Sequence, residues 1–110
     1  FARVLGHYVR DEHALDLMMA LRKMTIMPAQ RLEARAPAFR RKGRLQIGAD
    51  ADITIFDPRR IVDRATFEEP MKSSDGVQFV LVNGVPVIVD GEFVPNVLPG
   101  RPMRAAMRLQ

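Results

Sequence analysis

The dipeptide Asn83-Gly84 restricts the fold of this chain more than any other feature of its sequence. It separates two apolar segments, 77–82 and 85–89, and Asn-Gly is the pair that two-residue type I′ turns prefer, because both central positions need a positive φ. The sequence therefore predicts an antiparallel hairpin over residues 77–89. The cross-strand pairs expected in it are Val82 with Val85, Leu81 with Pro86, Val80 with Val87, and Phe79 with Ile88.

This register gives the hairpin two apolar faces, and both need cover from the rest of the protein. The faces consist of Val80, Val82, Val85 and Val87 on one side, and of Phe79, Leu81 and Ile88 on the other. Because Pro86 has no N–H group, we expect an edge or a local break in pairing on the side toward which that N–H would point. A few short strands with two apolar faces do not close a sandwich by themselves, so the sequence indicates part of a larger interior.

Two further strands are expected before the hairpin. Residues 53–56 are expected to form a buried strand, which Asp57-Pro58 ends. In residues 45–47, Leu45 and Ile47 alternate with polar neighbours, which is typical of a short half-buried strand. Tight turns are expected at Gly48, at Asp90-Gly91 and at Pro99-Gly100.

The first part of the chain has helical periodicity instead. A first apolar stripe consists of Val4, Leu5, Tyr8 and Val9. Asp16 is expected to be the N-cap of a second helix, because a short carboxylate side chain can accept a backbone N–H group of the first turn. The buried face of that helix is expected to carry Leu17, Leu21 and Met24.

Prolines divide the segment that follows. Residues 25–27 are expected to break the second helix, and Pro28 to begin a short third helix anchored by Leu32, because proline suits the first helical position. Pro37 blocks further helix and favours an extended conformation at Ala36. The predicted fold class is therefore α+β, with N-terminal helices in residues 1–35, a linker in 36–42, and short antiparallel strands in 43–110.

Composition and charge exclude several classes of protein. With 47% hydrophobic and 27% charged residues, the chain is like an ordinary globular domain, and no apolar run is long enough to span a membrane. It contains no cysteine, which excludes disulfides and thiolate chemistry and fits a reducing, cytoplasmic location. The net charge is +4, with basic clusters at 40–44 and at Arg101, Arg104 and Arg108. These clusters lack interleaved aromatic residues and a groove-reading motif, so we expect a solvated surface and no nucleic-acid partner.

No catalytic, cofactor-binding or metal-binding role is assigned to any residue of this chain. His7 and His13 are the only histidines, and their spacing of six residues corresponds to about 600° of helical rotation, which places them on different faces. We therefore expect surface or capping histidines. Asp50 and Asp52 alternate in a turn, which favours backbone capping over a paired carboxylate site. Ser73-Ser74 has no histidine nearby in the sequence.

Three motifs, in order along the chain, resemble the C-terminal region of amidohydrolase-superfamily enzymes. The central motif is Gly43-x-Leu45-x-x-Gly48-x-x-Ala51-Asp52-Ile53-x-Ile55-Phe56-Asp57. It resembles the stretch in which such enzymes leave the catalytic barrel and re-enter a small β domain. The other two motifs are similar to the preceding helix and turn and to the terminal hairpin: Met24-Thr25-x-x-Pro28-Ala29-x-x-Leu32 and Val82-Asn83-Gly84-x-x-Val87-x-x-Asp90-Gly91.

Further segments are similar to the N-acyl-D-amino-acid deacylase (D-aminoacylase) branch of that superfamily. They are Arg3-Val4-Leu5-Gly6-x-Tyr8-Val9-Arg10, Asp63-Arg64-Ala65-Thr66-Phe67-Glu68 and Leu98-Pro99-Gly100-Arg101. The chain departs from the pattern at Glu33, where relatives usually have a glycine, and at His7, where an arginine is expected. Neither departure lies at a catalytic position of the family.

The resemblance implies a structural role for this chain. It implies that residues 1–35 supply the last helices of a (β/α)₈ barrel and that residues 43–110 supply half of a composite β-sandwich, with the N-terminal part of the same polypeptide as partner. The parent enzyme would use zinc to activate water and an aspartate to move its proton, releasing a carboxylate and a D-amino acid. That aspartate is expected before Phe1, so we expect this chain to hold no cofactor and to be inactive alone.

Two alternatives remain open. The parent could be a cyclic-amide hydrolase of the dihydroorotase or hydantoinase kind, or the chain could be a stand-alone interaction module without enzymatic activity. The sequence that precedes Phe1 would discriminate, because the His-x-His metal ligands of the family lie there. For the isolated chain, exposed apolar surface predicts self-association.

Overall fold

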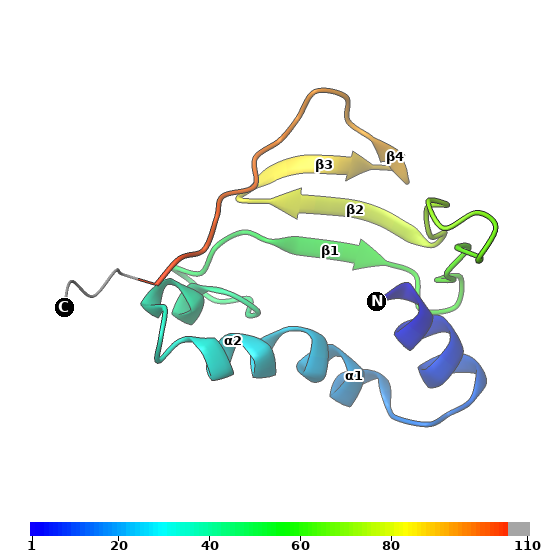
Figure 1. Cartoon of the computed structure of the whole chain (residues 1–110), viewed down its shortest axis with the longest axis horizontal. Coiled ribbons are helices and arrows are strands. Elements are labelled where there is room, and N and C mark those ends of the chain that lie inside the picture. The colour runs from blue at the N-terminus through cyan, green and yellow to red at the C-terminus, as the bar shows by residue number, and fades with distance from the viewer. Residues whose placement is uncertain (106–110) are drawn as a thin grey trace.

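The computed structural model describes residues 1–105, in which the helices precede all the strands (Figure 1). The elements in order are η1 (Val4–Asp11), α1 (Leu17–Met24), α2 (Ile26–Leu32), η2 (Pro37–Arg41), β1 (Ile53–Phe56), β2 (Val77–Val82), β3 (Val85–Val89) and β4 (Glu92–Phe93). The four strands form one antiparallel sheet in the order β1-β2-β3-β4. The predicted α+β class is confirmed. No helix within residues 1–105 has the length and apolar character needed to cross a membrane.

The first two predicted helices are present, and the cap of the second is confirmed. Asp16 has an extended backbone, and its Oδ1 accepts the N–H of Met19 at 2.8 Å. Element η1 is a π-helix, and the N–H of Glu12 donates to the carbonyl of His7 at its end. The wider turns of a π-helix rotate Tyr8 away from the buried Leu5, so Tyr8 is 45% exposed and does not belong to the predicted apolar stripe.

The third helix begins earlier than predicted. The chain breaks only at Thr25, and α2 starts at Ile26, so Pro28 is the third helical residue and not the first. Proline fits there because the first four N–H groups of a helix have no partner within it. Leu32 was expected to anchor this helix but is 44% exposed, and the buried residue is Ala29. Ala36 is extended as predicted (φ −131°, ψ 94°), and Pro37 begins the short 3₁₀ helix η2 inside the linker.

Strand β1 has the predicted bounds, but the register of the hairpin is right only near its turn. Val82 pairs with Val85 and Leu81 with Pro86, as expected. Beyond them a bulge leaves Val87 without an opposite residue, and Val80 pairs with Ile88.

The prediction that Ile88 shares a face with Phe79 is therefore wrong. The bulge directly follows Pro86, whose ring fixes φ and which brings no N–H. On its other side, β3 pairs with β4 only at Ile88 and Val89, so the expected break in pairing near Pro86 is confirmed.

Two of the other predicted features are absent, and two are present. Residues 45–47 form no strand, because no other described strand lies beside them; Leu45 is 81% exposed, and Ile47 is fully exposed. Pro99-Gly100 forms no turn, and the chain turns instead at Asn96, whose φ is 61°. The turns at Gly48 and at Asp90-Gly91 are confirmed by positive φ at all three positions.

The core lies where the helices meet one face of the sheet, close to β1 (Figure 1). Its buried residues are Leu5, Ala20 and Ile61, against which Phe56 and Val77 of the sheet are packed. A second bulge, between β1 and β2, turns Val77 to the same side as Phe56. The opposite face of the sheet contributes nothing to this core. That face carries the cross-strand pairs Ile53 with Leu81 and Ile55 with Phe79.

Glycines allow a close backbone contact between η1 and the segment that joins β1 to β2. The backbone of Ile61 lies between Gly6 of η1 and Gly76, which precedes β2. A Cβ atom on Gly6 would lie 2.5 Å from the carbonyl oxygen of Ile61, and one on Gly76 would lie 2.5 Å from its nitrogen and Cα. Two residues that lack a Cβ therefore hold one buried residue between the two halves of the chain.

Candidate functional site

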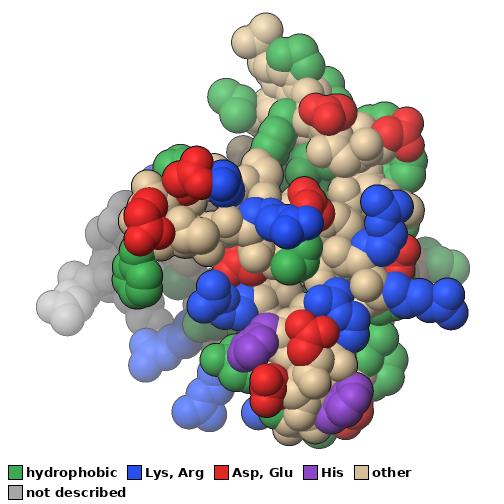
Figure 2. Space-filling model, turned by 90° about the vertical axis from the view of Figure 1, so that its right-hand side faces the viewer, with side chains coloured by type: hydrophobic (Ala, Val, Ile, Leu, Met, Phe, Trp, Pro, Cys, Tyr) green, Lys and Arg blue, Asp and Glu red, His purple; other side chains and the backbone are tan. Residues whose placement is uncertain are grey.

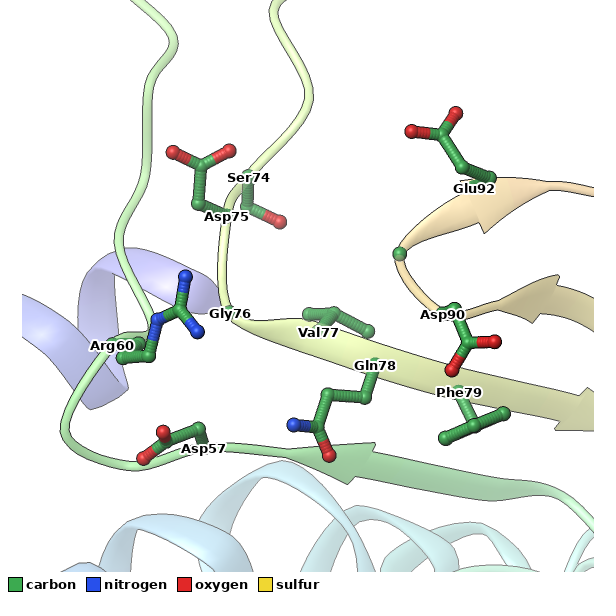
Figure 3. Close-up of a pocket in the computed structure, with 11 residues that line it drawn as sticks. Asp57, Arg60, Ser74, Asp75, Gly76, Val77, Gln78, Phe79, Asp90 and Glu92 are labelled. Carbon is green, nitrogen blue, oxygen red and sulfur yellow. The ribbon is translucent and has the colours of Figure 1, made fainter.

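A polar pocket lies at the end of the sheet where β1 ends and β2 begins (Figure 3). Its volume is about 500 Å³. The residues lining it are Asp57, Arg60, Ser74, Asp75, Gly76, Val77, Gln78, Phe79, Asp90, Gly91 and Glu92. Two tight turns bring these residues together, because the segment after β1 and the β3-β4 turn approach the start of β2 from opposite sides.

Hydrogen bonds fix two of the four carboxylates of this pocket, Asp57 and Asp75. Asp57 ends β1, where its Oδ1 accepts the N–H of Arg59 at 2.9 Å and its N–H donates to the carbonyl of Gly76. Asp75 accepts from Nε of Arg64 at 2.7 Å. Figure 3 shows the side chain of Arg60 on the same side of the pocket as Asp57.

The side chains that line this pocket are suited to binding a ligand and not to catalysis. Its lining holds four carboxylates, one guanidinium and one serine hydroxyl, but neither histidine nor cysteine. Ser74 therefore has no imidazole to accept its proton, as a serine nucleophile requires. A cationic group or a polar segment of polypeptide fits such a lining, whereas amide hydrolysis needs an activated nucleophile as well.

A second polar cluster joins the linker to the turn of the hairpin. Nζ of Lys42 lies 3.0 Å from Oδ2 of Asp50 and also donates to Oδ2 of Asp52. The other oxygen of Asp52 accepts the N–H of Asn83 at 2.8 Å. Next to it, the N–H of Gly84 donates to the carbonyl of Ala51 at 2.9 Å. The cluster therefore fixes the type I′ turn against the segment that leads into β1.

The charges of this cluster support one another. Burial alone would lower the pKa of Lys42, but its hydrogen bonds to Asp52 and Asp50 and their negative charges outweigh burial and raise it. Burial would raise the pKa of Asp52, but the hydrogen bonds from Lys42 and from the backbone of Asn83, together with the lysine charge, lower it. Both groups are thus held in their charged forms.

Backbone capping was predicted for Asp50 and Asp52, and the structure shows it for Asp52 only. Asp52 caps a backbone N–H, although that group belongs to the hairpin turn and not to the local turn. Asp50 binds the cations Lys42 and Arg41, with 3.5 Å to the latter. Lys42 was not predicted as their partner, although a basic run shortly before two alternating acids is a signal for such pairing.

The two histidines lie on one surface of the molecule, close to acidic side chains (Figure 2). His7 stacks edge-to-face on Tyr8, with 4.8 Å between ring centroids. His13 follows η1 with a φ of 52°, and its Nδ1 lies 3.2 Å from the carbonyl oxygen of Val9. Nearby, the hydrogen bond from Arg10 lowers the pKa of Asp11, with smaller contributions from the two histidines. Within residues 1–105, no group of three His, Cys, Asp or Glu residues is arranged to hold a metal ion.

Ion pairs neutralise part of the basic cluster at residues 40–44. Besides Lys42, the guanidinium of Arg44 pairs with Glu33 at 3.4 Å, and both side chains are partly buried. Of the second basic cluster, Arg108 lies outside the described residues. The absence of a nucleic-acid partner stays a prediction.

Comparison with known proteins places these features in a larger context. A sequence model of the amidohydrolase family matches residues 2–88. The chain is 42% identical over 104 residues to the N-acyl-D-glutamate deacylase of Alcaligenes xylosoxydans xylosoxydans, covering 94% of this chain and 20% of that protein. It is 44% identical over 87 residues to the D-aminoacylase of the same organism, covering 79% of this chain and 17% of the relative.

A solved structure has the same fold. It is the N-acyl-D-glutamate deacylase of Bordetella bronchiseptica complexed with zinc and a phosphonate inhibitor, a mimic of the tetrahedral reaction intermediate. The TM-score is 0.77 at 41% sequence identity, over 94% of this chain and 20% of that one. The chain therefore spans about a fifth of the length of the relatives that it matches.

Proposed function

Because this chain belongs to the amidohydrolase family, we propose that it is the C-terminal part of a metal-dependent amidohydrolase, in which its role is structural and not catalytic. The observation that carries this proposal is the sheet. One of its faces packs on the helices, while the other, with Ile53, Ile55 and Phe79, contributes nothing to the core. An apolar sheet face needs a second layer, and a chain that spans a fifth of its relatives leaves ample polypeptide to supply it.

The proposed domain boundaries follow the change from helices to strands along the chain. Residues 1–35 are the last helices of a (β/α)₈ barrel, 36–42 are the linker, and 43–110 are half of an accessory β domain. The N-terminal part of the same polypeptide supplies the other half. The clamp of Ile61 between Gly6 and Gly76 supports this arrangement, because it fixes the barrel helices and the accessory sheet to each other.

The reaction proposed for the whole enzyme is the hydrolysis of N-acyl-D-amino acids to a carboxylate and a D-amino acid. The support is the similarity to deacylases acting on N-acyl-D-glutamate and N-acyl-D-aspartate, at 42% and 37% identity. Both names describe a substrate in which an acyl group is joined by an amide bond to a D-amino acid. The side chain and acyl group that this enzyme selects would be set by parts of the polypeptide outside residues 1–110.

The residues described do not fit the zinc centre of such an enzyme. A hydrolytic zinc site needs three protein ligands from His, Cys, Asp or Glu, and no such group exists within residues 1–105. The part of the enzyme that holds and uses zinc is therefore proposed to lie elsewhere in the polypeptide. No chemical step is assigned to the side chains of this chain.

The proposal is tested by comparing the 110-residue chain with the longer polypeptide that contains it. Both are supplied with zinc and assayed for D-glutamate release from N-acetyl-D-glutamate, with N-acetyl-L-glutamate, dihydroorotate and hydantoin as control substrates. We expect release of the D-amino acid by the longer polypeptide only. Bound zinc with amide hydrolysis in the 110-residue chain would overturn the structural role, and preferential ring opening of a cyclic amide would overturn the substrate class.

The isolated chain is proposed to self-associate through its uncovered apolar surface. Fully or nearly fully exposed apolar side chains include Leu45, Ile47, Phe67, Met71 and Leu98. Patches of this kind mark interaction surfaces or promote association. Sedimentation of the chain as a monomer at high concentration, with no binding of a hydrophobic dye, would contradict this proposal.

A further inference from the structure

The segment between β1 and β2 presents its apolar side chains to solvent. We name residues 63–72 the docking loop. Phe67 is fully exposed, and Met71 is 91% exposed. A single exposed apolar residue is ordinary, but a fully exposed phenylalanine beside an exposed methionine in one loop is not.

Hydrogen bonds within the docking loop give it a defined conformation. Oδ1 of Asp63 accepts the N–H of Ala65 at 3.0 Å, and the hydroxyl of Thr66 accepts the N–H of Glu69 at 3.0 Å. The N–H of Thr66 also donates to the carbonyl of Glu69. These bonds close a turn around Phe67 and fix its direction.

Four of the five charged side chains of the loop are engaged in ion pairs. Asp63 pairs with Arg3 of the first helical segment at 3.0 Å, and Arg64 pairs with Asp75 at 2.7 Å. Lys72 pairs with Glu69 within the loop. The Arg3 pair ties the loop to η1, so the loop and this helix keep one orientation. Because positive and negative groups neutralise one another here, a partner would be recognised by apolar contact and not by charge.

A groove runs beside the exposed phenylalanine. Its volume is about 340 Å³, and it is lined by Arg3, Asp63, Ala65, Thr66, Phe67 and Pro70. The ion-paired Arg3 and Asp63 both line it, at the junction of helix and loop. A groove of this size accepts one or two apolar side chains of a neighbouring segment.

We propose that the docking loop is an intramolecular docking surface, on which an apolar surface of the preceding part of the same polypeptide packs against Phe67, Pro70 and Met71. This inference rests on the proposed function, because it takes this chain to be the C-terminal part of a longer enzyme. The occupant follows from two facts. The relatives are about five times as long as this chain, and the loop is tied to the helix that the proposal places on the barrel. The proposed occupant is therefore the barrel part of the same polypeptide.

The test measures how fast a thiol at the tip of the loop reacts. The chain contains no cysteine, so Phe67→Cys introduces a single reactive group, and trypsin releases it in the peptide 65–72 between Arg64 and Lys72. Glu68→Cys is the matched control, because it places the thiol in the same exposed turn and the same tryptic peptide. Each variant is labelled with iodoacetamide, both in the 110-residue chain and in the longer polypeptide, and the rate at that peptide is read by mass spectrometry.

We expect the two thiols to react at similar rates in the 110-residue chain. In the longer polypeptide, labelling of Phe67→Cys should fall by about tenfold or more, while Glu68→Cys slows by about twofold at most, because a covered thiol reacts only after local opening. Unchanged labelling of Phe67→Cys in the longer polypeptide would overturn the proposal. Protection in the 110-residue chain that grows with its concentration would also overturn it, since the occupant would then be a second copy.

The failure of this inference is distinguishable from failure of the proposed function. Deacylase activity of the longer wild-type polypeptide reports on the function, whereas the labelling rate reports only on the loop. Activity without protection at position 67 refutes the docking surface alone. A Phe67→Leu variant guards against a folding defect, because it keeps an apolar tip and should leave the thermal unfolding of the longer polypeptide within about 2 °C of wild type, whereas Phe67→Ala should lower it by several degrees.

Discussion

Replacing Gly6 by alanine tests the close contact between helix η1 and the buried Ile61. The new Cβ would lie 2.5 Å from the carbonyl oxygen of Ile61, well inside van der Waals contact. That same oxygen accepts a hydrogen bond of 2.7 Å from Arg10, and the side chain of Ile61 is only 3% exposed. The helix cannot move away without disturbing both the hydrogen bond and the core.

The expected change in stability is a difference between two opposing effects. Alanine is about 1 kcal/mol more favourable than glycine inside a helix. Overpacking costs about 1–3 kcal/mol, and weakening a hydrogen bond from a charged donor costs about 1.5 kcal/mol more. The two costs outweigh the gain, so Gly6→Ala should destabilise the chain by about 2 kcal/mol, which corresponds to a fall in Tm of roughly 10 °C for a domain of this size.

The assay is urea and thermal unfolding followed by circular dichroism. Gly100→Ala is the matched control, because nothing lies within 4 Å of the added Cβ and its φ is not in the positive range, so its stability should stay within about 0.5 kcal/mol of wild type. Gly6→Ala and Arg10→Ala should be less than additive, since both act on the carbonyl of Ile61. A Gly6→Ala variant as stable as wild type, or more stable, would refute the reasoning.

Three further predictions concern single residues. Gly76→Ala should destabilise the chain by more than Gly48→Ala. Both glycines have positive φ (87° and 83°), but only Gly76 also contacts the backbone of Ile61. Equal losses of unfolding free energy in urea would contradict this. Asp16→Ala should cost about 1 kcal/mol through loss of the helix cap, while Asp16→Asn should cost much less, as measured by the same unfolding curves. The folded state lowers the pKa of Asp52, so the contribution of Asp52 to stability is present above about pH 4 and is lost as the pH falls through the folded pKa. Asp52→Asn should flatten that part of the profile of unfolding free energy against pH. An unchanged profile would refute the assignment.

The candidate site could be predicted from the sequence only in part. Asp50 and Asp52 were recognised as turn residues, because alternating aspartates beside a glycine are a local signal. Their partner Lys42 was not recognised, since a basic run beside a turn is compatible with full exposure as well. The polar pocket at Asp57 and Asp90 was not predicted either, because it needs two turns from different parts of the sheet to meet.

The sequence by itself determined the elements whose stability is local. Asn83-Gly84 fixes a turn through the φ values that it permits, Asp16 begins a helix with its own side chain, and the β-branched residues of 53–56 favour a strand. Each depends on neighbours within a few positions, so each was predictable.

Only the tertiary structure decided the features that join distant residues. The bulge at Val87 moved Ile88 to the face of Val80, the residues 45–47 found no strand to pair with, and Ile61 became the contact between Gly6 and Gly76. Pairing and close packing depend on which surfaces meet in space, and alternation along the chain carries no information about that. The sequence indicated that both faces of the hairpin need cover, but only the fold decided which face packs on the helices and which stays uncovered.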